Sequence, residues 1–251
     1  MTIQLNTEQA IRYSRQLMLP ALDFRGQEAL LASNVLLVGM GGLGCAAAPY
    51  LVASGVGSIT LADNDAVDRS NLQRQILYRE ADIGQSKVQQ AAASLRQLNS
   101  EIKIDALQQR LSAEDLATLV PRFSLVLDCT DNLATRNAIN AACVNAKVPL
   151  VSGAAIRFEG QLASFSMQGD EACYYCLSQL FGEQQLSCME AGILSPVVGV
   201  IGVMQALEAV KILAGVGSPS YGKLQLFDGL TGQWRQFTLS KDPGCRVCGA
   251  G

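Results

Sequence analysis

The stretch from Asn34 to Asp63 constrains the fold more than any other part of this sequence. A short apolar run ends in three glycines, Gly39, Gly41 and Gly44, at the G-x-G-x-x-G spacing. A helical pattern of small residues follows, and a second apolar run ends at Asp63. This order predicts strand, glycine turn, helix and strand, with backbone N–H groups and the helix N-terminus facing a phosphate. Because Asp63 could accept hydrogen bonds from ribose hydroxyls, we expect a ribonucleotide, most commonly NAD in such a turn.

Strands and helices then alternate as far as Gly153, which predicts a doubly wound, Rossmann-like, mainly parallel sheet. The later strand patterns, at 161–167, 223–228 and 233–239, look more antiparallel and surround an apolar helix expected at 196–213. That helix begins at a Ser-Pro pair and ends before Gly215. At the other end of the chain, a single helix is expected from Asn6 to about Leu19.

Charge and hydropathy exclude several classes of partner. The chain has 19 Lys and Arg against 22 Asp and Glu, so no nucleic-acid or anionic membrane surface is expected. The N-terminal residues lack the pattern of a secretory signal, so we expect a cytoplasmic protein. The most apolar stretch carries Gln205, Glu208 and Lys211 at steps of three. That single polar stripe favours a mostly buried helix over a membrane span.

The absence of histidine and the presence of eight cysteines constrain the chemistry. No imidazole of this chain can serve as acid, base or metal ligand. In a cytoplasmic protein, cysteines serve as metal ligands, nucleophiles or core residues more often than as disulfides.

Four of the cysteines form two C-x2-C pairs, Cys173 with Cys176 and Cys245 with Cys248. Four thiolates in two such pairs can close a tetrahedral structural zinc site. The pairs are much farther apart than the ~15–20 residues of a compact zinc ribbon. The metal would therefore attach the C-terminal tail to the second half of the chain, with redox-active pairs or unpaired thiols as the alternatives.

The remaining cysteines divide into two kinds. Cys45, Cys129 and Cys143 lie in apolar helix and strand patterns, where core packing is expected. Cys188 falls in a polar loop where a thiol would be exposed. It could be a nucleophile or an inert loop cysteine, and the residues leave both interpretations open.

Polar residues gather where two strands end. The loop after Asp63 is rich in donors and acceptors, and a later strand runs into an acidic turn at Asp128 to Asn132. Lys87 lies near the start of a helix, where a cation opposes the helix dipole. An anionic ligand would explain its position.

These motifs together resemble the E1-like activating enzymes of ubiquitin-like proteins, particularly the bacterial molybdopterin-synthase adenylyltransferase branch. The branch that serves thiamine synthesis shares every nucleotide motif and is the near alternative. The resemblance spans nearly the whole chain and rests on residues 12–16, 39–44, 63, 70–75, 87, 128–132, 153–157 and 176–182, and on both cysteine pairs.

The resemblance implies ATP in place of NAD, with Mg²⁺. The implied nucleotide-binding residues are Gly39, Gly41, Gly42, Asp63, Ser70, Asn71, Gln73, Arg74, Lys87, Asp131 and Asn132. Arg74, Lys87 and Arg15 would neutralise the triphosphate, and Asp131 would hold the metal ion. Arg15 would act in the partner subunit's site, which implies a homodimer.

The implied reaction is adenylation of the C-terminal glycine carboxylate of a small ubiquitin-fold sulfur carrier ending in Gly-Gly, with release of pyrophosphate. A carboxylate is already a nucleophile at neutral pH, so a chain without histidine can catalyse this step by positioning and electrostatics. A separate protein would supply the sulfur. The single domain 1–251 would comprise a helical arm (1–33), a nucleotide-binding half (34–155) and a carrier-binding, zinc-bearing half (156–251).

Two other interpretations are weaker. A nicotinamide-dependent oxidoreductase is supported by the glycine turn alone and would not need Arg74, Lys87 and Asp131 in successive loops. A non-catalytic scaffold that binds a ubiquitin-fold partner would not need these residues either.

Overall fold

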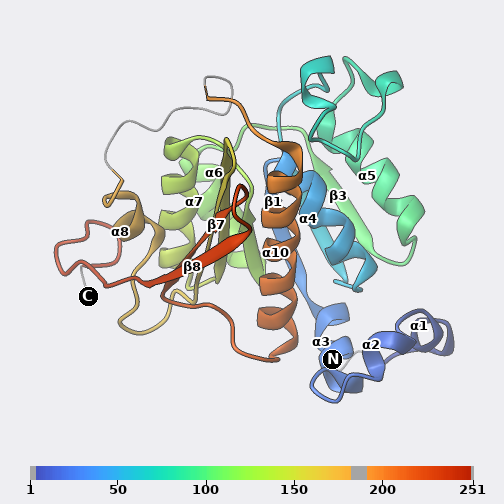
Figure 1. Cartoon of the computed structure of the whole chain (residues 1–251). Helices are drawn as coiled ribbons and strands as arrows, with labels where there is room; N and C mark the ends of the chain where they lie inside the picture. The colour runs from blue at the N-terminus through green and yellow to red at the C-terminus, as the bar shows by residue number, and fades with distance from the viewer. Residues whose placement is uncertain (1–3, 182–190, 250–251) are drawn as a thin grey trace.

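One mixed sheet organises the whole chain, as a computed structural model that describes residues 4–181 and 191–249 shows. Its eight strands lie in the order β3-β2-β1-β4-β5-β6-β7-β8, with helices on both faces (Figure 1). The strands are β1 (Asn34–Val38), β2 (Ser58–Ala62), β3 (Lys103–Leu107), β4 (Leu125–Asp128), β5 (Leu150–Ile156), β6 (Glu159–Phe165), β7 (Lys223–Asp228) and β8 (Gln233–Thr238).

From β1 to β5 the helices alternate with the strands, as the sequence predicts. The helices of the described residues are α1 (Thr7–Arg12), α2 (Ser14–Leu17), α3 (Asp23–Ala32), α4 (Gly42–Ala53), α5 (Lys87–Leu98), α6 (Ala113–Leu119), α7 (Leu133–Ala146), α8 (Tyr174–Ser178) and α10 (Ser195–Ala214). Short 3-10 turns lie at Arg69–Asn71, Glu80–Asp82 and Val120–Arg122.

The five strands from β3 to β5 are parallel, which confirms the doubly wound half of the prediction. β1 lies between β2 and β4. The chain therefore adds β2 and β3 on one side of β1, and then crosses over to add β4 and β5 on its other side. In an open α/β sheet, such a reversal leaves a crevice at the carboxyl ends of the two central strands. The site is therefore expected beyond β1 and β4.

The last three strands are antiparallel, as the sequence predicts. β5 is longer than the expected 148–152 segment, because it continues to Ile156 and pairs along its full length with β6. The expected junction between residues 155 and 156 therefore falls inside a strand, and one continuous sheet joins the two halves.

Each face of the sheet has its own hydrophobic core. On one face, β1 and β2 pack against α4, α5 and α10 through residues such as Leu37, Leu51 and Ile201, all fully buried. On the other face, Leu36 and Val126 pack with α6, α7 and the cysteine-bearing segments. A strand that is buried on both faces reads as a continuous apolar run, which is how β1 and β4 appear in the sequence.

α10 is long and apolar enough to cross a membrane by length and composition alone. In the fold it packs against α4, β5 and β6, in front of the sheet in Figure 1. Its polar stripe is largely buried: Gln205 Nε2 donates to the carbonyl of Asp128 at 2.8 Å, and Glu208 accepts from the Ser220 backbone N–H at 2.8 Å. These contacts with neighbouring segments mark α10 as a core helix.

The expected single helix from Asn6 to Leu19 is wrong in one respect, because it is broken at Tyr13. The cap is as predicted, since Asn6 and Gln9 exchange side-chain and backbone hydrogen bonds. Tyr13 is 2% exposed, and its hydroxyl accepts from Asn99 Nδ2 at 3.0 Å. The Tyr13 ring packs against Gly55 and Asn99, and the helix is interrupted at this residue. Helix propensity could not predict the break, because both contacts are distant in sequence.

Candidate nucleotide site and cysteine cluster

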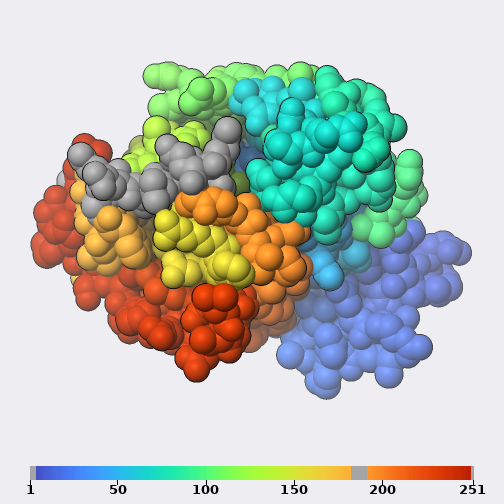
Figure 2. Space-filling model, turned by 45° about the horizontal axis from the view of Figure 1, so that its top comes forward, coloured from blue at the N-terminus to red at the C-terminus, as the bar shows by residue number. Residues whose placement is uncertain are grey.

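A pocket of about 1000 Å³ opens at the carboxyl ends of β1, β2 and β4. Figure 2 looks onto this face, where the teal segment after β2, the green turns and the orange start of α10 gather around a hollow. The eleven residues expected to bind the nucleotide come from five separate segments of the sequence. The lining includes all eleven: Gly39, Gly41, Gly42, Asp63, Ser70, Asn71, Gln73, Arg74, Lys87, Asp131 and Asn132.

The glycine turn is held against the neighbouring strands. Gly39 has a φ of +94°, and a Cβ there would lie 2.7 Å from the carbonyl oxygen of Cys129. A Cβ on Gly44 would lie 2.1 Å from the carbonyl oxygen of Gly39. α4 begins at Gly42, with Gly41 as its cap and no side chain bonded to its first N–H groups. The N-terminus of α4 therefore offers its backbone donors to an anion in the pocket.

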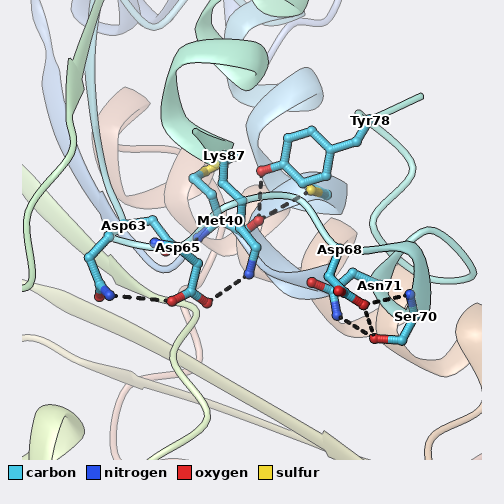
Figure 3. Close-up of polar contacts among 10 residues, drawn as sticks. Met40, Asp63, Asp65, Asp68, Ser70, Asn71, Tyr78 and Lys87 are labelled. Atoms are coloured by element: carbon cyan, nitrogen blue, oxygen red, sulfur yellow. Dashed lines mark hydrogen bonds and ion pairs between the residues drawn. The ribbon is translucent and has the colours of Figure 1, made fainter. Parts of the chain in front are cut away.

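Asp63 lies directly after β2 and faces the glycine turn (Figure 3). Its Oδ2 accepts from the Met40 backbone N–H at 2.7 Å, and its Oδ1 accepts from the Asp65 backbone N–H at 2.8 Å. Each carboxylate oxygen can accept a further bond, so the half-buried Asp63 can still bind a ribose. Tyr78 donates from its hydroxyl to the Met40 carbonyl at 2.8 Å, which fixes the other side of the turn.

The loop after Asp63 carries a short turn that presents its polar side chains to the pocket. Asp68 accepts from the backbone N–H and the hydroxyl of Ser70 at 2.8 and 2.5 Å, and these bonds lower the pKa of the Asp68 carboxyl. Arg74 Nη1 donates to the Ser70 carbonyl at 3.3 Å. The guanidinium keeps its other donors for an anionic ligand.

Lys87 is the first residue of α5 and is only 5% exposed. Its Nζ lies 2.8 Å from Asp65 Oδ2. The sequence predicts that Lys87 faces an anionic ligand, and in the structure Lys87 lines the pocket. Its ion pair with Asp65 was not foreseen.

The turn after β4 contributes Asp131 and Asn132 to the opposite wall of the pocket. Asn132 caps α7, accepting from the Thr135 backbone N–H at 2.9 Å. Asp131 is exposed and makes no hydrogen bond or ion pair with any residue in the described ranges. A carboxylate without a protein partner, in the same pocket as Arg74 and Lys87, fits a Mg²⁺ ligand.

A network of buried hydrogen bonds attaches this turn to β4, β5 and α7. Asp128 accepts from Thr130 Oγ1 at 2.7 Å and from Ser152 Oγ at 2.8 Å, and Arg136 donates to the carbonyls of Thr130 and Gly153. Burial opposes the charge on Arg136, but the Asp128 carboxylate, together with Tyr174 and Asp131, outweighs this cost and raises the pKa of Arg136. The turn that carries Asp131 is therefore held in one conformation.

Arg15 is the expected site residue that the chain does not bring to its own pocket. It is exposed on α2, and its Nη1 lies 3.9 Å from the Met18 sulfur. Figure 1 places α2 beyond the amino end of β1, away from the glycine turn. Within one chain, Arg15 does not line the site.

The pocket has further lining residues that sequence reasoning missed. Gln109, Arg110 and Leu111 follow β3, and Arg157 and Gln161 come from the β5–β6 hairpin. Their positions at strand ends were a usable signal, because ligands bind beyond the carboxyl ends of strands. Gln75 also lines the pocket, and its Oε1 is buried without a partner among the described residues. A ligand with a hydrogen-bond donor would satisfy that oxygen.

The two cysteine pairs meet, as the sequence predicted. The sulfur atoms of Cys173, Cys176, Cys245 and Cys248 lie within 4.8 Å of one another, and two of the separations are 3.8 and 3.6 Å. Four sulfurs at ~2.3 Å from one zinc ion would be about 3.8 Å apart, so the spacing fits a tetrahedral metal site.

Backbone donors in this cluster favour a thiolate at Cys245. The backbone N–H groups of Val247 and Cys248 each donate to Cys245 Sγ at 3.4 Å. Burial would raise the pKa of Cys245, but these N–H bonds, together with hydrogen bonds from the Cys176 and Cys248 thiols, outweigh it and lower that pKa to about 7. Burial raises the pKa of Cys173 and of Cys248. Asn140 Nδ2 donates to Cys173 Sγ at 3.4 Å and orients that ligand.

The other cysteines in the described ranges are core residues, as expected. Cys45 and Cys143 are fully buried, and Cys129 is 6% exposed. Burial raises the pKa of Cys45 to about 12, and burial together with Asp128 raises the pKa of Cys129. Both thiols stay protonated at neutral pH. Cys188 lies outside the described residues.

Comparison with known proteins places this geometry in a family. A sequence profile described as the ThiF family matches residues 13–247. The chain belongs to the ThiF family. The resemblance to E1-like activating enzymes is thereby confirmed, and with it the expected fold class.

Several curated relatives match the chain along nearly all of its length. It is 53% identical to the molybdopterin-synthase adenylyltransferase of Escherichia coli K12, covering 98% of this chain and 99% of that protein. It is 49% identical to the sulfur carrier protein ThiS adenylyltransferase of the same strain, covering 98% and 97%. Mouse adenylyltransferase and sulfurtransferase MOCS3 is 47% identical over 98% of this chain but only 54% of its own length.

Solved structures share the fold at lower identity. The crystal structure of E. coli MccB with ATP superposes with a TM-score of 0.84 at 24% identity, covering 97% of this chain and 75% of that chain. At this identity the likeness concerns the fold alone.

The close approach at Gly44 gives the first testable prediction. Gly44→Ala forces a Cβ against the carbonyl of Gly39, so we expect ATP affinity to fall at least tenfold in isothermal titration calorimetry. Gly199→Ala on α10 is the matched control, because nothing lies within 4 Å of an added Cβ there. ATP affinity retained in Gly44→Ala would contradict a nucleotide at this turn.

Proposed function

We propose that this chain is an adenylyltransferase that activates the C-terminal glycine carboxylate of a small ubiquitin-fold sulfur carrier in molybdopterin synthesis. The observation that carries the proposal is the convergence of Arg74, Lys87 and Asp131 around the glycine turn in one pocket. Relatives named molybdopterin-synthase adenylyltransferase, 47–53% identical, support it. ATP would be the nucleotide and Mg²⁺ the metal ion.

The proposed step needs charge compensation and no general base. The carrier's carboxylate oxygen attacks the α-phosphorus of ATP, the bond from that phosphorus to the bridging oxygen breaks, and pyrophosphate leaves. Negative charge accumulates on the leaving group, where Arg74 and Lys87 would stabilise it. Asp131 would hold Mg²⁺, which supplies further electrostatic stabilisation when it is bound. These roles are consistent with a chain that has no histidine.

The nucleotide would be oriented by the groups around β1 and β2. Asp63 would accept bonds from the ribose, while Gly41, Gly42 and the first N–H groups of α4 would face the phosphates. Ser70, Asn71, Gln73 and Asn132 would add polar contacts from the flanking turns.

The carrier's tail would approach along the β5–β6 side of the pocket. Ala154, Ala155 and Gln161 line that side, and Gly192 and Ile193, in the segment before α10, close it. Small side chains leave room for an extended tail ending in Gly-Gly, which has no side chains of its own at the end. The antiparallel half of the sheet would therefore bind the carrier, and the parallel half the nucleotide.

The carrier's identity has one near alternative. The relative named sulfur carrier protein ThiS adenylyltransferase is 49% identical, only slightly less than the first molybdopterin-synthase relative. A thiamine-pathway carrier is therefore the second candidate substrate. A separate protein would donate the sulfur that replaces AMP, and we propose a cytoplasmic location.

The decisive experiment is ATP–pyrophosphate exchange with each carrier. We expect exchange that requires Mg²⁺ and a carrier ending in Gly-Gly, with a higher kcat/KM for the molybdopterin-pathway carrier than for the thiamine-pathway carrier. Asp131→Ala should lower the exchange rate about a hundredfold or more, because a metal-dependent contribution of about 3 kcal/mol to the transition state is lost.

Asp105→Asn is the control for that experiment, since Asp105 lies on β3 outside the pocket and pairs with the exposed Lys103 at 3.0 Å. It should exchange at the wild-type rate. No exchange with either carrier, or full activity in Asp131→Ala, would disprove the proposed function.

We also propose a homodimer in which Arg15 reaches the partner's site, because Arg15 lies outside its own pocket. Mixing inactive Arg15→Ala and Asp131→Ala subunits gives heterodimers in which one site has both groups intact. We expect recovery to about a quarter of the wild-type rate for random pairing of subunits. Arg25→Ala, an exposed substitution near the same arm, should leave activity unchanged. An absence of recovery would show that Arg15 does not act in trans.

Zinc is the proposed occupant of the four-cysteine cluster, given its spacing and the two backbone N–H groups that favour a thiolate at Cys245. We expect one zinc ion per chain by elemental analysis, and loss of that zinc in Cys248→Ser. Metal removal should lower the stability of the C-terminal segment while ATP affinity changes less than threefold, because no cluster residue lines the nucleotide pocket. Cys143→Ala should keep its zinc, and a wild-type protein without zinc would refute the assignment.

A further inference from the structure

Asp65 is a pocket residue that the proposed reaction leaves without a role. It follows the ribose-facing Asp63 by two positions and lines the same pocket. Its carboxylate lies 2.8 Å from the ammonium of Lys87 (Figure 3). No other carboxylate among residues 4–181 and 191–249 lies within 4.0 Å of that ammonium.

The two partners differ sharply in exposure. The Lys87 side chain is 6% exposed, whereas the Asp65 side chain is 57% exposed. A buried ammonium without a counter-charge is costly, so Lys87 depends on Asp65 more than Asp65 depends on Lys87. Lys87 is also the first residue of α5, where a cation opposes the helix dipole. Both its burial and its position at the helix N-terminus make Lys87 unfavourable for stability, so the ion pair is better explained by a role in binding.

Backbone contacts fix Asp65 relative to the nucleotide turn. The Asp65 carbonyl accepts from the Lys87 backbone N–H at 3.0 Å, and its own N–H donates to Asp63 Oδ1 at 2.8 Å. Asp63 in turn accepts from the Met40 N–H at 2.7 Å. One chain of hydrogen bonds therefore links the glycine turn, the ribose carboxylate and the ammonium of Lys87.

An ammonium group has three donors, and Asp65 occupies one of them. The other two remain available to phosphate oxygens. We propose that Asp65 is a positioning residue that aims the Lys87 ammonium at the β- and γ-phosphates of ATP. This inference rests on the proposed function and assigns a role to a residue outside the set that contacts the reacting atoms.

The test is a double-mutant cycle with Asp65→Asn and Lys87→Ala in pyrophosphate exchange. Asp65→Asn should lower kcat/KM for ATP about tenfold in the otherwise wild-type protein. In the Lys87→Ala background, the same change should alter kcat/KM less than twofold, because Asp65 acts through Lys87. Equal losses in the two backgrounds would overturn the inference.

Calorimetry with ATP and AMP separates positioning from general damage to the site. AMP lacks the β- and γ-phosphates, so Asp65→Asn should leave AMP affinity within twofold of wild type and weaken ATP binding at least threefold. Parallel losses for both nucleotides would indicate a disturbed ribose or glycine turn and would also overturn the inference. Asp105→Asn should change neither affinity.

Two further outcomes are informative. An increased magnesium requirement in Asp65→Asn that persists with Lys87→Ala would make Asp65 a metal ligand, contrary to the inference. If the wild-type protein shows no exchange with either carrier, the proposed function fails. Nucleotide binding needs no carrier, so the same ATP titrations, repeated with Asp65→Asn in the Lys87→Ala background, still decide whether Asp65 acts through Lys87.

Discussion

The rest of the molecule depends on one constraint: the chain turns to opposite faces of the sheet after the neighbouring strands β1 and β4. The two strands are neighbours, but their following helices, α4 and α7, cover opposite faces of the sheet. The turns after these strands are thus forced apart, and the resulting crevice receives one wall from each. The glycine turn brings backbone donors, and the turn after β4 brings the free carboxylate of Asp131. Neither wall could form a triphosphate site alone.

The fold was predictable wherever apolar periodicity and caps agree. β7 has the bounds that the sequence indicates, and the left-handed Gly215 ends α10 as expected. Tyr13 and the extension of β5 were not foreseen, because their causes lie elsewhere in the chain: Asn99 holds the tyrosine, and β6 pairs with the whole of β5. A local pattern cannot report a partner that is distant in sequence.

The candidate site shows the same division. Asp63 and Lys87 could be predicted as site residues from the sequence. Asp63 ends the strand that follows the glycine motif, and Lys87 lies at a helix N-terminus, where a cation is unfavourable. Arg110 and Gln161 belong to no such motif. Only the end of β3 pointed to Arg110, and Gln161 lies within β6, where the strand order places it beside the pocket. The network beneath Asp131 was also hidden, because Arg136 and Ser152 look like ordinary surface-helix and strand residues until burial is known.

The cysteine cluster has a consequence beyond holding the C-terminal tail. Cys173 and Cys248 bound a chain loop that contains α10, β7 and β8, and a four-fold cross-link would close that loop in the unfolded chain as well as in the folded one. Closing a long loop removes conformational freedom chiefly from the unfolded ensemble. The polar contacts of Gln205 and Glu208 would then form within a chain already restricted in its search. With zinc bound, the tail would thus act at a distance, since it would reduce the entropy that α10 must lose to reach the sheet.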